Sequence, residues 1–400
     1  MLNETQLNRY ADVLLWGLRT ARSARFKKGD VILVRFHLPA VRLAEILQAR
    51  LLESGMHPVL RFSPTPTMEK DFYSLANQDQ LTFQSPAMAP LYKKLNGGIF
   101  LHAPESITHL RRVDPKKIGR RAVSLKPLRD IMDRRDAQGL FGWTLCMLPT
   151  HEQAKHANLS LAEYTDQIVK ACWLNRRDPV SQWQTIYKNA QKVKRWLNRM
   201  SVKHYHVESA NIDLIITPGQ QRRWIGLSGH NIPSFELFLS PDWRGTNGVY
   251  FANLPSYRSG NLVTNVRLEF KNGRAIKIEA GEGEDFTRQQ LGMDPGANRV
   301  GEFSLTDKRF SKINRFMANT LFDENFGGPQ GNCHVAVGSS YADTFAGEPA
   351  ELTKARKRKL GFNDSALHWD LVNTEKKRVV AHLNNGRRIT IYENGRFTYS

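Results

Sequence analysis

The sequence feature that most constrains the fold is a change of pattern near residue 203. Before it, segments with apolar residues at helical spacing alternate with short β-rich runs. After it, strand patterns dominate, and several of them are joined by turns that contain Asn-Gly. The chain is therefore predicted to combine an α/β domain with a second α+β domain that is rich in antiparallel sheet.

The first half alternates between helices and strands. Helices are predicted over residues 5–22 and 39–54, with a basic segment around 111–136 further on. The β-rich runs between the helical stretches are Val31–Val34, Val59–Leu60, Gly98–His102 and Trp143–Leu148. This alternation favours a largely parallel sheet flanked by helices. No Gly-x-Gly-x-x-Gly motif follows any of these runs, so a dinucleotide site is not expected.

A domain junction is predicted in residues 160–200. This stretch has the pattern of two consecutive helices separated by Asn175–Pro179. The prediction is an N-terminal α/β domain over residues 1–200 and a C-terminal metal-binding catalytic domain over residues 201–400.

The second half is predicted to be rich in antiparallel strands. Asn272-Gly273, Asn385-Gly386 and Asn394-Gly395 each lie between two β-rich runs, which is typical of hairpin turns. The predicted strands are Ile212–Thr217, Val266–Phe270, Ile276–Ile278, Val379–Leu383, Arg388–Tyr392 and Phe397–Tyr399.

Charge and cysteine content narrow the class of protein. Against 38 acidic side chains the sequence has 58 basic ones, giving a net charge of +20 that attracts polyanions. Cys146, Cys172 and Cys333 form no paired framework, which argues against a disulfide-stabilised secreted domain. No apolar run is long enough to cross a bilayer, so a cytoplasmic location and no membrane partner are expected.

Five segments of the second half share one character: each embeds a His or a carboxylate among Gly, Asn, Pro and small residues. In the last of them, His368 and Asp370 alternate along a predicted strand, so both side chains face the same way. Polar groups beside tight turns are typical of a site built from loops. The segments are Asn231–Glu236, Asn298–Glu302, Leu321–Asn325, His334–Tyr341 and Asn363–Asp370.

The ordered set of segments resembles the aminopeptidase T and aminopeptidase S family of two-metal metallopeptidases. The N-terminal pattern, with Lys28-Gly29-Asp30 before a strand and Glu53-Ser54-Gly55 after a helix, is similar to that family as well. The resemblance implies a metal-dependent aminopeptidase that works as a homodimer on peptides with a free N-terminus. It implies metal ligands and catalytic groups at Glu236, Glu302, Glu324, His334, Tyr341, His368 and Asp370.

Charge repulsion supports this interpretation. Four carboxylates in one pocket would repel each other unless cations lay among them, and two divalent ions would balance four negative charges. Imidazole and carboxylate ligands suit zinc, cobalt or manganese. In such a site, two metals activate a water molecule for hydrolysis.

The residues are given different roles. The ligands are predicted to be Glu236, Glu302, His334, His368 and Asp370, with Glu302 as the bridge. Glu324 is predicted to act as the general base, and Tyr341 to stabilise the oxyanion of the tetrahedral intermediate.

Two other functions remain open, and the charge of the protein favours both. One is a two-metal phosphohydrolase or nuclease, although no phosphate-binding motif is present, so nucleic acid is not the favoured partner. The other is a catalytically altered metallopeptidase-like protein that binds polyanions. Two departures from the family bear on substrate choice: the glycine-rich stretch 325–333, expected to be a flexible insertion, and the basic run Lys354–Lys359.

Overall fold

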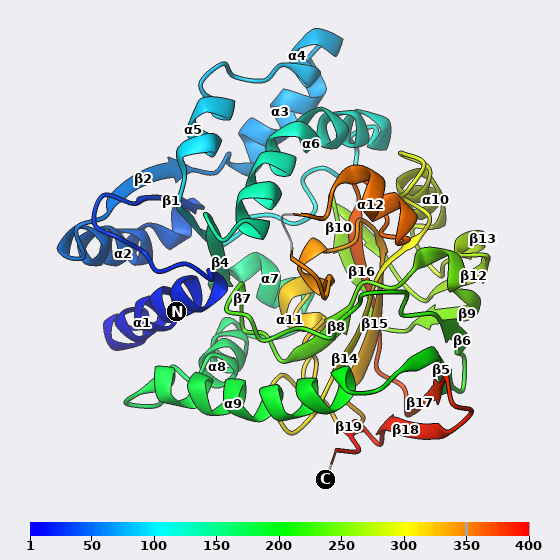
Figure 1. Ribbon diagram of the computed structural model, residues 1–400. Helices are drawn as coiled ribbons and strands as arrows, with labels where there is room; N and C mark the ends of the chain where they lie inside the picture. Colours follow the sequence, from blue (N-terminus) through cyan, green and yellow to red (C-terminus); the bar gives the residue numbers. More distant parts are fainter. Residues whose placement is uncertain (349–350, 400) are drawn as a thin grey trace. The chain divides into compact units, whose positions relative to one another are not determined.

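The computed structural model describes residues 1–348 and 351–399 (Figure 1). The chain forms two compact units. One contains Met1–Ile186 and the return segment Leu227–Ser234, and the other contains Tyr187–Gly226 and Phe235–Ser400. Helix α9, Pro179–Asn198, contributes residues to both. The domain boundary at residue 200 stays a prediction.

The first unit is built on a parallel sheet with the strand order β2-β1-β3-β4-β7. Its strands are β1 Val31–Phe36, β2 His57–Phe62, β3 Gly97–His102, β4 Gly142–Met147 and β7 Asn231–Ile232. The last strand comes from the return segment, so the chain leaves this unit within α9 and returns to extend its sheet.

Helices connect and cover the strands of this sheet. The first of them begins with a capping box, in which the Asn3 side chain accepts from the Gln6 N–H and the Gln6 side chain accepts from the Asn3 N–H. The helices are α1 Glu4–Ala21, α2 Val41–Glu53, α3 Pro66–Leu75, α4 Gln78–Thr82, α5 Met88–Lys94, α6 Pro115–Ala137, α7 His151–His156 and α8 Leu161–Ala171, with a 3₁₀ turn at Leu38–Ala40. Most of the basic segment 111–136 is thus a single helix, α6.

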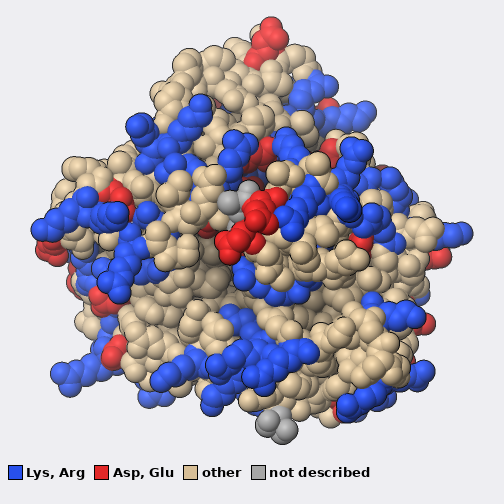
Figure 2. Space-filling model, viewed as in Figure 1, with Lys and Arg blue, Asp and Glu red and all other residues tan. Residues whose placement is uncertain are grey.

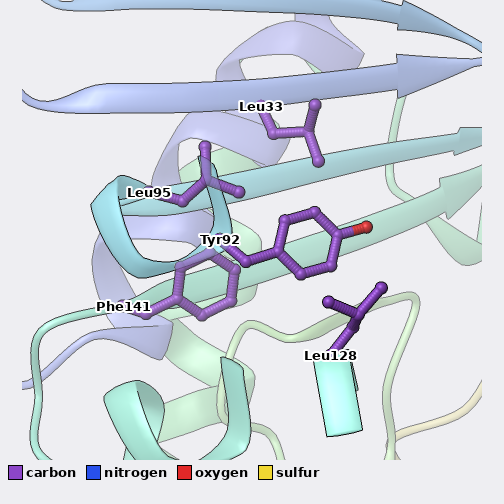
Figure 3. Packing of buried hydrophobic residues seen from close by; sticks show 5 residues of the cluster. All are labelled: Leu33, Tyr92, Leu95, Leu128 and Phe141. Atoms are coloured by element: carbon purple, nitrogen blue, oxygen red, sulfur yellow. The ribbon is translucent and has the colours of Figure 1, made fainter. Parts of the chain in front are cut away.

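Alternate residues of β1 face opposite layers of the unit. Leu33 packs with side chains of the α5 and α6 region, as Figure 3 shows for Leu33, Tyr92, Leu95, Leu128 and Phe141. Ile32 faces the opposite layer: a Cβ at Gly97 would lie 2.9 Å from Ile32 and 3.2 Å from Leu18 of α1. The sheet is therefore buried on both sides, as parallel sheets are.

The second unit contains two antiparallel sheets, which we call the large sheet and the buried sheet. The large sheet has the order β13-β12-β9-β6-β5-β17-β18-β19, and the buried sheet has the order β16-β15-β14-β8. The large sheet comprises β5 Val202–Ser209, β6 Asp213–Ile216, β9 Asn247–Ala252, β12 Val266–Lys271, β13 Arg274–Glu279, β17 Lys377–Leu383, β18 Arg388–Glu393 and β19 Arg396–Phe397. The buried sheet comprises β8 Glu236–Leu239, β14 Val300–Thr306, β15 Asn332–Gly338 and β16 His368–Asn373.

Short elements complete this unit. The hairpin of β10 with β11 stands apart from both sheets. These elements are β10 Ser256–Arg258, β11 Asn261–Val263, α10 Glu284–Leu291, α11 Thr320–Asp323 and α12 Lys354–Lys359, with 3₁₀ turns at Trp243–Gly245 and Ala342–Thr344.

Asn-Gly turns connect the hairpin strands at positions predicted from the sequence. Asn272 and Gly273 have φ angles of 48° and 75° between β12 and β13, and Asn394 and Gly395 have 51° and 76° between β18 and β19. These left-handed values are the ones that Asn and Gly tolerate best. The predicted combination of a parallel sheet flanked by helices with an antiparallel-rich region is confirmed.

The buried sheet has one apolar face, which packs on the large sheet. Tyr205 of β5 lies 6.1 Å from Phe303 of β14, measured between ring centroids. From β9, the Tyr250 hydroxyl donates to the carbonyl of Leu371 at 2.6 Å and to that of Cys333 at 3.2 Å. Every residue of β14 and β15 is buried. The opposite face of the same strands is therefore held inside the protein as well.

We predict that Leu33→Ala lowers the free energy of unfolding by about 2–5 kcal/mol, because it removes a fully buried side chain from the core of the first unit. Leu60→Ala on β2 is the matched control: this side chain is 40% exposed, and the expected change is within about 0.5 kcal/mol. Urea unfolding followed by fluorescence would measure both. Equal losses in the two variants would contradict the assigned core.

Candidate metal centre

The register of the buried sheet places the predicted ligands on one face. Glu302 of β14 is opposite Ala336 of β15, which is opposite Asp370 of β16. Glu236 joins them from β8, where it pairs with Thr306. Directly paired residues share a face, and so do alternate residues along a strand. That face carries Glu236, Glu302, His334, His368 and Asp370.

The side chains on this face converge. His334 Nε2 lies 3.2 Å from a Glu236 oxygen, 3.2 Å from a Glu302 oxygen and 3.7 Å from an Asp370 oxygen. His368 Nε2 lies 3.3 Å from an Asp370 oxygen and 3.7 Å from the second oxygen of Glu302. All five residues are buried or nearly so.

These contacts form two groups that share one carboxylate. Glu236, Glu302 and His334 present ligand atoms within 4.8 Å of one another, and so do Glu302, His368 and Asp370. Each group offers imidazole nitrogen and carboxylate oxygen, the donors that zinc, cobalt and manganese accept. Each oxygen of Glu302 faces a different histidine. The residues therefore fit one ion in each group, with Glu302 between them.

Neighbouring groups orient these side chains. The Ser304 hydroxyl donates to Glu236 at 2.9 Å, and His368 Nδ1 lies 2.9 Å from the carbonyl oxygen of Ser339, which leaves His368 Nε2 for the centre. Arg258 of β10 donates to the His368 carbonyl at 3.0 Å, and its charge favours the ionised form of Asp370. No role was predicted from the sequence for Ser304, Ser339 or Arg258. Two of them had a sequence signal: Ser304 alternates with Glu302 on one strand, and Ser339 lies within the segment His334–Tyr341.

Glu324 follows α11 and is held from both sides. Its backbone carbonyl accepts from Asn332 Nδ2 at 3.0 Å and from the Thr306 hydroxyl at 3.3 Å. Its carboxylate accepts from Asn325 Nδ2 at 3.3 Å. The glycine-rich stretch that follows is tied down too, since the N–H of Gly327 donates to the Ile313 carbonyl at 2.7 Å. The expected flexible insertion is instead hydrogen-bonded around the predicted base.

Tyr341 lies beside the centre. Its ring centroid is 4.7 Å from that of His368 and 5.7 Å from that of Phe238. The residue keeps 40% of its surface exposed, which places it at the edge of the site. Desolvation of the hydroxyl, followed by the charges of Glu302 and Asp370, raises its pKa well above 10. The hydroxyl therefore stays protonated and can donate a hydrogen bond.

In the metal-free protein, protons take the place of cations at the two histidines. Burial lowers the pKa of His334, but its hydrogen bond to Glu302 and the charge of Glu236 outweigh this and raise the pKa to about 9. Burial also lowers the pKa of His368, and the charge of Asp370 raises it to about 9. Both imidazoles are then cationic at neutral pH.

The pKa values of the carboxyl groups are shifted in opposite directions. Burial raises the pKa of Asp370, but the charge and hydrogen bond of His368 dominate and lower it to about 2. Burial raises the pKa of Glu236 to about 8, with Glu302 adding to the rise and His334 opposing it. Burial and the charge of Glu236 raise the pKa of Glu324 well above 4.5. Without cations, Glu236 and Glu324 are thus held neutral, as expected for crowded acidic groups.

A small pocket adjoins the centre at Asp370. Its lining includes Ser256 and Tyr257 of the β10 hairpin and Asp323 of α11. Burial raises the pKa of Asp323 to about 8, while hydrogen bonds from the N–H groups of Met317 and Asn319 oppose this rise. No pattern within one segment predicts this pocket, because its walls come from distant parts of the chain.

The chain is similar to known proteins over nearly its whole length. The model of the thermophilic metalloprotease family M29 matches residues 3–397. Aminopeptidase AmpS of Bacillus subtilis (strain 168) is 29% identical over 270 residues, which cover 64% of this chain and 63% of that protein, less than two thirds of its length. The structure of wild-type AmpT from Thermus thermophilus superposes with a TM-score of 0.78 at 21% identity, covering 98% of this chain and 99% of that one.

The fold is also shared with a protein that carries out a different reaction. The structure of 2,5-dihydroxypyridine dioxygenase from Pseudomonas putida KT2440 superposes with a TM-score of 0.51 at 13% identity, covering all of this chain and 99% of that one. Fold alone therefore does not fix the chemistry, and the side chains of the site must.

We predict that metal binding releases protons and strengthens as the pH rises from 7 to about 9. The pKa values of His334 and His368 lie near 9, so each ion must displace protons that are present at pH 7 and absent above pH 9. The apparent affinity should rise about tenfold per pH unit for each proton displaced. Calorimetric zinc titrations in buffers of different ionisation enthalpy would count these protons. An affinity that is flat from pH 7 to 9 would show that the imidazoles are already neutral.

Proposed function

This chain belongs to the thermophilic metalloprotease family M29, and we propose that it is a metal-dependent aminopeptidase that removes the N-terminal residue from peptides. The family match over residues 3–397 confirms the resemblance seen in the sequence. The observation that carries the proposal is the pair of ligand groups that share Glu302 on one face of the buried sheet.

The proposed ligands are Glu236, Glu302 and His334 for one divalent ion and Glu302, His368 and Asp370 for the other. Support comes from the convergence of His334 Nε2 and His368 Nε2 on opposite oxygens of Glu302. When bound, two divalent ions polarise the scissile carbonyl and lower the pKa of the attacking water. Zinc, cobalt and manganese all suit this donor set.

Glu324 is the proposed general base. It accepts a proton from the attacking water and passes it to the leaving amine. Its pKa is raised by burial and by neighbouring carboxylates, and cations among those carboxylates would favour its ionised form. A carboxyl group whose pKa lies near the working pH can both accept and return a proton.

Tyr341 is the proposed donor to the oxyanion. The raised pKa keeps its hydroxyl protonated at neutral pH, and the ring lies against His368, beside the position where the carbonyl must bind. A hydrogen-bond donor lowers the barrier to hydrolysis only if it binds the transition state more strongly than the substrate.

We propose that the substrate is a peptide with a free N-terminus. An α-amino group can bind among carboxylates, whereas a blocked amine cannot carry the matching charge. No helix in the described part of the chain is long and apolar enough to cross a membrane. A homodimer and a cytoplasmic location remain proposals.

The positive charge of the protein also suits a second function, the hydrolysis of a polyanion. With 58 basic and 38 acidic residues, the protein would attract a polyanion, and Figure 2 shows Lys and Arg spread over the visible face. A phosphodiester could occupy the same two-metal centre. The proposal favours peptides because the family supports a peptidase and the sequence contains no phosphate-binding motif.

We predict that the purified protein releases the chromogenic amine from unblocked aminoacyl anilides and leaves their N-acetylated counterparts intact. The acetyl group removes the charged amine while keeping the scissile bond. Chelation should abolish the activity, and zinc, cobalt or manganese should restore it. Retention of metal without cleavage of any anilide would contradict the proposal, and phosphodiesters would then be tested.

We predict that Glu324→Gln lowers kcat by about 10²–10⁴-fold while the protein keeps its metals, because the amide cannot accept a proton. His368→Ala, in contrast, should lose metal. Glu279→Gln, a surface change in the same unit, is the matched control and should leave both quantities unchanged. Steady-state kinetics and elemental analysis would separate the three variants. Full activity in Glu324→Gln would exclude this residue as the base.

A further inference from the structure

Three histidines lie together on the large sheet, away from the candidate centre. His204 and His206 alternate along β5, and His382 of β17 is directly opposite His204 in the register. Their common face is the one opposite to Tyr205 and Val207, which are buried towards the buried sheet. All three imidazoles are half-buried and thus reachable from solvent.

The imidazole rings are already close. The ring centroids of His204 and His382 are 4.3 Å apart, and those of His206 and His382 are 6.3 Å apart. A His-x-His pair on one strand with a third histidine across from it supplies three nitrogen donors, the number that many open zinc sites use. At the longer separation, the His206 side chain would have to rotate about its own bonds for all three imidazoles to reach one ion.

Carboxylates border the histidines on the same face. Asp213 of β6 lies 2.7 Å from His206 Nε2, and Glu208 lies 3.9 Å from His206 Nδ1. A carboxylate that binds one ring nitrogen fixes the tautomer and leaves the other nitrogen as a donor to a metal. Asp213 is therefore placed to orient His206, and Glu208 to supply negative charge or a fourth ligand.

Two of the three imidazoles, those of His204 and His382, have pKa values below the usual value for histidine. Burial lowers the pKa of His204, and the positive charge of His382 lowers it further. Burial and the charge of Arg388 lower the pKa of His382. Neutral imidazole is the form that binds metals, so little free energy is lost to deprotonation at pH 7. The nearby cations Lys203 and Arg388 oppose a bound ion, whereas the charge of Glu208 favours a cation at His382.

We propose that His204, His206 and His382 form a second metal site, for zinc or another divalent ion that prefers imidazole, on the outer face of the large sheet. The site is independent of the proposed peptidase activity, since it shares no residue with the candidate centre. An ion there would connect β5 to β17, two strands that are adjacent in the sheet and distant in sequence. Binding would stabilise the second unit by linkage.

The test uses the full-length protein, first freed of metal with a chelator that is then removed by gel filtration. Zn²⁺ is titrated calorimetrically into wild type, His382→Ala and the control His57→Ala, whose histidine is exposed in the other unit. The expected result is equal zinc uptake by wild type and His57→Ala, and one zinc ion fewer per chain for His382→Ala. Equal uptake by wild type and His382→Ala would overturn the proposal.

A second variant protects the test from a folding artefact. Asp213→Asn keeps all three imidazoles and removes only the orienting charge, so the additional ion should bind about 10–100-fold more weakly. Far-UV circular dichroism checks that each variant is folded. Undiminished affinity in Asp213→Asn together with undiminished uptake in His204→Asn would show that the histidines are only stacked neighbours. Aminoacyl anilide hydrolysis, measured in parallel, reports on the other centre alone.

Discussion

The period of two along β14 and β15 is the constraint on which the rest of the second unit depends. Odd-numbered residues such as Phe303 and Val335 face the large sheet, and even-numbered residues such as Glu302 and His334 face the candidate centre. A shift of one residue in the pairing would exchange the two faces and bury the carboxylates against aromatic rings. The apolar contacts of Phe303 with Tyr205 and Trp224 therefore fix the register, and the register in turn assembles the ligands.

Electrostatics then decides what the assembled face can do. Four acidic groups influence one another at Glu324, whose pKa is raised by burial and by the charges of Glu236, Asp370 and Glu302. In the metal-free protein this crowding is relieved by protons on the histidines and on two of the acids. Divalent ions would relieve it in another way, by favouring ionised carboxylates and neutral imidazoles. The same arrangement of charged groups thus accounts for the protonation of the metal-free face and for its capacity to bind divalent ions.

The sequence predicted local features well and long-range pairings poorly. The Asn-Gly hairpins and the strand-helix alternation are local signals, and both are present in the structure. Strand β7 was not predicted as part of the parallel sheet, because Asn231–Ile232 is too short to show a period and joins β4 across a large gap in the chain. The ligand residues could be named because five segments resemble a known family in order, although their roles remain proposals. Arg258 and the pairing of His382 with His204 depend on contacts between distant segments, which periodicity within one segment cannot reveal.

The contrast between a basic protein and an acidic centre bears on how a peptide would bind. The net charge of +20 attracts the carboxylate groups of a peptide, whereas carboxylate oxygens of the candidate centre can accept hydrogen bonds from its amino group. A free peptide has one charge of each sign at its ends, so the two attractions act on opposite ends and favour entry with the amino end first. At physiological ionic strength the screening length is about 8 Å, so this effect is confined to the last stage of approach. In the proposed reaction, the carboxylates of the candidate centre, rather than the overall charge, would determine which end of the peptide is cleaved.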